Sequence, residues 1–91
     1  MLNDVKLALG IATDLFDYDL NNLIEACKID LKMCGIDEGK ITTDDALVNR
    51  AIIFYCKAYF RNSDHAERYK KAYESLRTAM SMAGEYRCTM S

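Results

Sequence analysis

The absence of proline constrains this chain more than any other feature of its sequence. The 91 residues contain no proline and only four glycines, whereas average usage would give about four or five prolines. A β-rich domain of this size needs many more chain breakers, so the sequence favours a few long helices joined by short loops. Apolar residues make up 51% of the chain and charged residues 29%, which is typical of one small globular domain with a thin core.

The first half of the chain predicts one short helix and one long helix. Asn3 is a suitable N-cap for a short helix that Gly10 ends. After a loop, a second helix is expected from about Asp19 to Cys34, where Gly35 stops it. Its apolar residues follow one helical stripe, as in a helix that packs by a single face: Leu20, Leu23, Ile24, Cys27, Leu31 and Cys34.

The third predicted helix is the central one. Thr42 or Thr43 is expected to cap a helix that runs from Asp45 to about Arg61. Its surface is apolar nearly all round, and only burial on several sides accounts for such a surface.

A fourth helix is expected to begin at Ser63 or Asp64 and to end at Gly84. The predicted fold class is therefore all-α: a small bundle of three long helices plus a short N-terminal helix, with an extended C-terminal tail. Residues 1–91 are expected to form a single helical domain, with a helical core at 1–84 and the tail at 85–91.

Two sets of side chains have no evident role inside a single chain. Ile29 and Met33 lie opposite the apolar stripe of the second helix, as scattered exposed residues or as a contact surface for another subunit. The third helix carries a narrow basic stripe made of Arg50, Lys57 and Arg61. Either these side chains extend their charged ends into water at the one solvent-exposed edge of the helix, or they contact an acidic partner. These five residues are candidate interface residues.

The predicted tail is a third candidate contact. In residues 85–91, apolar and polar side chains alternate. Seven residues cannot form a stable sheet alone, so the tail is either disordered or extended on a neighbouring subunit, with Tyr86 and Arg87 as candidate contacts.

Charge is distributed unevenly along the chain. Residues 1–49 carry ten acids and four lysines, a net charge of −6, whereas residues 50–91 carry eight bases and four acids, a net charge of +4. The two halves either pair within one chain or present complementary faces to identical subunits that meet head to tail.

No motif in the sequence predicts catalysis, a metal site or a bound cofactor. The neighbours of the one histidine, His65, are too close in sequence to form a triad with it. The four cysteines contain no C-x-x-C pair, so reduced thiols are expected. The segment from Asp17 resembles the start of an EF-hand loop, but its sixth position is Asn22 rather than glycine and its twelfth is Lys28 rather than glutamate.

The longest strictly apolar run covers residues 51–56, far short of the roughly 18 residues that a membrane span requires. No signal peptide is visible either. A soluble chain made in a reducing compartment, without a membrane partner, is therefore expected.

Several segments, in this order and spacing, fit one known family from end to end: Val5–Ile11, Asp17–Ile36, Asn49–Tyr55 and Ala66–Leu76 followed by Gly84–Arg87. They resemble the head–tail connector (adaptor, also called DNA-packaging) family of tailed bacteriophages and prophages.

This resemblance implies a structural virion protein without catalytic residues or cofactors. Such a protein forms a homo-oligomeric ring below the portal protein, around the channel through which DNA passes as cargo. It docks the next head-completion or tail connector protein, joins head to tail and completes the head after packaging. The implied location is the head–tail junction of the virion, assembled in the cytoplasm of the bacterial host.

A second class of function stays open from the residues alone, namely a small helical regulatory or nucleic-acid-binding module. The basic stripe of the third helix and the bases of the fourth helix favour it. Against it, Tyr69 and Tyr73 are expected on the apolar face of the fourth helix, whereas Lys70 and Lys71 point elsewhere.

Overall fold

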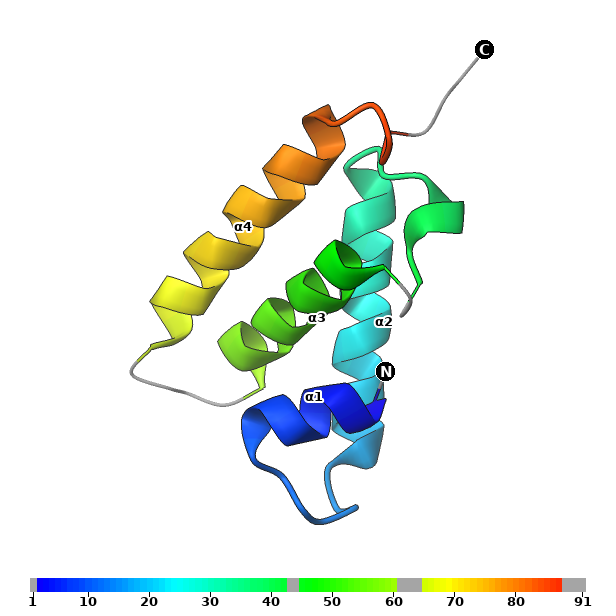
Figure 1. Ribbon diagram of the computed structural model, residues 1–91. Coiled ribbons are helices and arrows are strands. Elements are labelled where there is room, and N and C mark those ends of the chain that lie inside the picture. Colours follow the sequence, from blue (N-terminus) through cyan, green and yellow to red (C-terminus); the bar gives the residue numbers. More distant parts are fainter. Residues whose placement is uncertain (1, 43–44, 61–64, 88–91) are drawn as a thin grey trace.

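The computed structural model describes residues 2–42, 45–60 and 65–87. In that part of the chain it contains four α-helices and one short 3-10 helix (Figure 1). In chain order these are α1 Leu2–Leu9, α2 Asp17–Met33, η1 Glu38–Lys40, α3 Ala46–Tyr59 and α4 Ala66–Met82. The predicted all-α bundle of three long helices and a short N-terminal helix is confirmed.

α3 lies at the centre of the bundle, as predicted, and contacts α1, α2 and α4. Four of its apolar side chains are fully buried and α4 contributes two residues. α2 buries four residues of its predicted stripe and leaves Leu23 half-buried. This buried core consists of Val5, Leu20, Ile24, Cys27, Leu31, Ile36, Val48, Ala51, Ile52, Cys56, Tyr73 and Met80. Cys34 is exposed, in contrast to its predicted place on the stripe, because α2 ends one residue before it.

Two glycines end helices as predicted. Gly10 and Gly35 have φ angles of +72° and +91°, in the left-handed region that glycine enters without a steric penalty. Gly84 does not act in this way: α4 ends at Met82, Ala83 is its C-cap, and Gly84 has no positive φ.

The predicted cap of α3 is wrong. Asp45, rather than Thr42 or Thr43, precedes the helix, and its Oδ1 accepts hydrogen bonds from the backbone N–H groups of Leu47 at 3.0 Å and Val48 at 3.1 Å. A cap oxygen must reach the amides of the first turn, and Thr42 lies too far back along the chain to do so. Thr43 lies outside the described residues.

The segment between α3 and α4 falls outside the described residues at 61–64. The predicted end of α3 at Arg61 and the predicted start of α4 at Ser63 or Asp64 both lie there. Within the described chain, α3 ends at Tyr59 and α4 begins at Ala66.

The start of the predicted tail is anchored on the chain itself. Arg87 forms an isolated antiparallel bridge with Ile36, and the N–H of Asp37 donates to the carbonyl of Tyr86 at 2.7 Å. The Tyr86 hydroxyl donates to Asp45 Oδ1 at 3.1 Å. Residues 85–87 therefore fold back against the loop that follows α2, and the rest of the tail lies outside the described residues.

Candidate interaction surfaces

The described part of the chain offers surfaces rather than an enclosed site. In residues 2–42, 45–60 and 65–87, no group of three or more His, Cys, Asp or Glu side chains is placed to hold a metal ion. No helix in those ranges has the length and apolarity needed to span a bilayer. The hollows on the surface are open and are lined mainly by helix faces.

A polar cluster ties α2 to α4. Asp30 Oδ2 accepts hydrogen bonds from the buried Tyr73 hydroxyl and from Arg77 Nη1, the latter at 2.8 Å. The Arg77 guanidinium lies 5.5 Å from the centroid of the Tyr73 ring. Sequence reasoning missed this cluster because its members are 43 and 47 residues apart.

Burial and the hydrogen bonds within this cluster shift the pKa values of its members. Burial alone would raise the pKa of Asp30, but the hydrogen bonds from Tyr73 and Arg77 outweigh it, so the pKa lies below the ordinary value. Burial, followed by the hydrogen bond to Asp30, raises the pKa of Tyr73. Burial raises the pKa of the Cys27 thiol to about 12. Asp30 is thus an ionised acceptor for two donors from α4.

The N-terminal corner of the molecule is held by Lys6. Its Nζ lies 2.7 Å from Asp14 Oδ1 and 2.9 Å from Asp17 Oδ1, so α1, the connection and the first turn of α2 are joined. The hydrogen bond from Lys6 lowers the pKa of Asp14. These contacts fix the corner that Figure 1 shows at the lower end of the molecule.

The structure places the predicted apolar pair on the surface. Ile29 is 59% exposed and Met33 is 81% exposed, on the side of α2 that faces away from the core. Ile29 and Ile41 also line an open hollow between α2 and η1. The role of the pair in a subunit contact stays a prediction.

The predicted basic stripe is not a continuous exposed row in the described chain. Arg50 is exposed, but the Lys57 ammonium lies 5.0 Å from the centroid of the Tyr69 ring and is held by that contact. Arg61 lies outside the described residues. Tyr69 also stacks on Phe54, with ring centroids 6.2 Å apart, so its ring is occupied within the chain rather than free to stack on a base.

The two predicted tail contacts have different surroundings. Tyr86 packs at the edge of the core and is hydrogen-bonded to Asp45. Arg87 is exposed, although its backbone is bridged to Ile36. Arg87 therefore keeps the more accessible side chain.

Most ion pairs in the described residues are local to the acidic half. Lys28 pairs with Glu25 at 3.5 Å, and Lys32 pairs with Glu38 at 3.4 Å. Of the pairs found there, only that of Asp30 with Arg77 joins the acidic half to the basic half. The charge difference between the halves is therefore left mainly on the surface.

On α4, Glu67 and Lys71, and Lys70 and Glu74, are spaced four residues apart as in helical ion pairs, but neither pair closes to an ion pair in the described structure. Exposed pairs gain little energy and restrict two long side chains, so this is an ordinary outcome. These charges stay available on the outside of α4.

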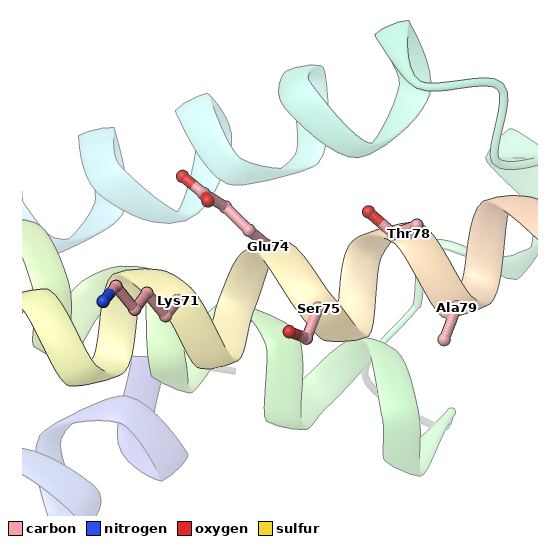
Figure 2. Close-up of a pocket in the computed structure, with 5 residues that line it drawn as sticks. All are labelled: Lys71, Glu74, Ser75, Thr78 and Ala79. Carbon is pink, nitrogen blue, oxygen red and sulfur yellow. The ribbon is translucent and has the colours of Figure 1, made fainter.

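The outer side of α4 carries an open hollow that sequence reasoning also missed (Figure 2). It is lined by Lys71, Glu74, Ser75, Thr78 and Ala79. In this view Glu74 and Thr78 point to one side of the helix and Ser75 and Ala79 to the other. In the sequence, the signal that could have identified this hollow is the set of small residues Ser75, Thr78 and Ala79 on the side of the helix opposite Tyr73 and Met80.

The protein-family model described as phage connector protein matches residues 1–87. Neither the curated proteins nor the solved structures gave a match. Because the family match covers all but the last four of the 91 residues, the chain belongs to the phage connector protein family, whose members are structural components of the virion.

Proposed function

We propose that this phage structural protein forms a homo-oligomeric ring at the portal vertex of a tailed phage or prophage, where it joins head to tail. In this proposal it binds the portal protein on one side and the next head-completion or tail connector protein on the other. DNA passes through its channel only as cargo, and the ring completes the head after packaging. The chain acts through assembly, without catalytic residues or a cofactor.

The observation that carries the proposal is the family match over residues 1–87, which includes every described element. Two properties of the fold support it. The molecule measures 45 × 23 × 18 Å, an elongated shape suited to standing beside identical copies. Large apolar side chains are exposed near both of its ends, with Leu15 at 83% in the α1–α2 connection and Met82 at 75% at the end of α4.

Purified protein, alone and mixed with portal rings from the same phage, tests this proposal. Mass photometry and negative-stain imaging are expected to show rings, or portal particles with an added layer of density on one face. A chain that stays monomeric and does not bind portal would contradict the proposal. Tight, salt-dependent binding to duplex DNA by that monomer would instead favour a nucleic-acid-binding module.

A matching experiment in the phage removes the gene and supplies it again from a plasmid. Without the protein, heads are expected to package DNA but to stay tailless, while tails assemble separately. Complementation restores infectious particles. Normal numbers of tailed, infectious particles in the deletion would refute a role in joining head to tail.

A further inference from the structure

α2 carries an outward-facing row of exposed residues on the side away from the core. Tyr18, Asn22, Glu25, Ile29 and Met33 are all exposed, and at 3.6 residues per turn they fall within a sector of about 80°. The buried residues of α2 lie on the opposite side of the helix. We call these five residues the outer α2 stripe. Its spacing of four, three, four and four residues is that of a helix packing against a second helix.

α4 carries the complementary feature. The hollow lined by Lys71, Glu74, Ser75, Thr78 and Ala79, here called the α4 hollow, lies about 170° around the helix from Tyr73 and Met80, which α4 buries in the core. The short side chains of Ser75, Thr78 and Ala79 leave an open groove beside the longer side chains of Lys71 and Glu74. Ridges on one helix pack into such grooves on another.

The charges of the two helices have opposite signs. α2 has four acids and two lysines, a net charge of −2, and α4 has four bases and two acids, a net charge of +2. The internal pair of Asp30 with Arg77 removes one charge from each side and leaves −1 and +1. Within the two surfaces themselves, Glu25 lies on the outer α2 stripe, where Lys28 pairs with it at 3.5 Å, and Lys71 and Glu74 line the α4 hollow. The attraction between identical subunits that place α2 against α4 therefore comes from the helices as a whole.

We propose that neighbouring subunits contact each other through the outer α2 stripe of one copy and the α4 hollow of the next, an inference that rests on the proposed ring. This contact is heterologous, with two different surfaces on each subunit, which is the kind that closes into a ring. The occupant of the α4 hollow is thus a second copy of this chain.

The direction of the helices fits this arrangement. The C-terminal ends of α2 and α4 lie at the same end of the molecule (Figure 1), where Ile36 and Arg87 bridge the segments that follow them. Rotation about a ring axis along these helices does not reverse them, so α2 of one subunit and α4 of the next run in the same sense.

Parallel packing gives a specific register. If Ile29 enters the α4 hollow beside Ser75, then Glu25 faces Lys71 one turn earlier and Met33 faces Ala79 one turn later, because each step is four residues on both helices. Each large apolar side chain then meets a small one, and the facing charges are opposite. Large side chains opposite small ones allow close packing of two helices.

Two single-residue variants test the contact. Ile29→Glu disables the outer α2 stripe, and Ser75→Glu disables the α4 hollow; both positions are exposed, so folding is retained and circular dichroism verifies it. In sedimentation velocity, each variant alone is expected to be monomeric. Their equimolar mixture is expected to form a heterodimer and nothing larger, because only one functional pair of surfaces is left. Leu7→Glu, at an α1 position that is 81% exposed, is the matched control and is expected to associate like the wild type.

Reversal of the facing charges tests the register. Glu25→Lys or Lys71→Glu alone is expected to weaken association about fivefold, as for an exposed ion pair. The double reversal is expected to return to within about twofold of the wild type. Single and double reversals that weaken association additively would refute the pairing of these two residues.

The outcomes separate this inference from the ring itself. If the wild type forms rings and Ile29→Glu or Ser75→Glu also forms rings, the α2–α4 contact is refuted but the ring is not. The same conclusion holds if the wild type forms rings and the mixed variants form no heterodimer. If the mixed variants form a heterodimer but the wild type forms no ring, even in the presence of portal, the α2–α4 contact is supported and the ring is refuted. Neither ring nor heterodimer refutes both.

Discussion

Replacement of Asp30 by alanine is the most informative single change in this fold. Asp30 is the shared acceptor for the Tyr73 hydroxyl and the Arg77 guanidinium, and this cluster joins α2 to α4. Asp30→Ala leaves the Tyr73 hydroxyl without its carboxylate partner at a site where the tyrosine side chain is only 2% exposed. Arg77, whose side chain is 28% exposed, turns toward water.

The expected loss is dominated by Tyr73. An unsatisfied buried hydroxyl costs about 1–3 kcal/mol. The ion pair with Arg77 is partly exposed, so its loss adds at most about 1 kcal/mol. We therefore expect the free energy of unfolding to fall by about 2–3 kcal/mol, which corresponds to a decrease in Tm of about 10–20 °C for a chain of this size.

Chemical denaturation followed by circular dichroism measures this loss. Tyr73→Phe removes the donor instead and is expected to cost about 0.5–1.5 kcal/mol, so the double variant Asp30→Ala/Tyr73→Phe is expected to cost less than the sum of the two. Asp19→Ala, at an exposed acid of the same helix that lies outside the outer α2 stripe, is the control and is expected to change little. Additive losses in the double variant would refute the coupling through this hydrogen bond.

The same cluster gives a pH dependence. Because the pKa of Asp30 is lower in the folded state, its contribution is complete above the unfolded pKa of about 3.9 and is lost as pH falls through the folded pKa. The difference in stability between wild type and Asp30→Ala is thus expected to be constant from neutral pH to about pH 5 and to shrink below about pH 4. A difference that grows in acid would contradict an ionised Asp30.

Three further changes test individual features. Gly35→Ala is expected to destabilise the fold by about 1–2 kcal/mol, because Gly35 has a φ of +91°; Gly84→Ala is the matched, nearly neutral control, and equal melting temperatures would refute the strain. Asp45→Ala is expected to cost about 1–2 kcal/mol through loss of the α3 cap, with Asp45→Asn recovering most of it in thermal melts. Iodoacetamide at pH 8 is expected to modify the exposed Cys34 but not the buried Cys27, whose thiol pKa is about 12; peptide mapping by mass spectrometry would expose the opposite order.

The positions of the helices were predictable because their signals are local. The apolar stripe of α2 and the left-handed glycines at 10 and 35 depend on neighbouring residues alone. The α3 cap was not predictable, because threonine and aspartate are both good N-caps. Its selection involves Tyr86, which donates to Asp45 from 41 residues away.

The candidate surfaces also divide into features that local sequence signals predict and features that depend on tertiary packing. Exposure of Ile29 and Met33 followed from their place opposite the apolar stripe. The contact of Lys57 with Tyr69 depends on how α3 meets α4, and that crossing is a tertiary property which a helical wheel does not contain. The helical pattern therefore places Lys57 on the basic stripe but does not reveal its contact with Tyr69.

Assembly is expected to stabilise α4, a helix at the edge of the bundle. α4 packs on α3 along one side and buries only Tyr73 and Met80 completely, and Asp30 of α2 adds a polar link to it. A neighbour whose α2 lies in the α4 hollow covers the opposite side of α4 and clamps the helix between two subunits. Because such binding acts on the folded state alone, it raises the apparent stability with protein concentration. Protection of α4 amides from hydrogen exchange should therefore increase on ring formation, while protection of the central α3 changes little.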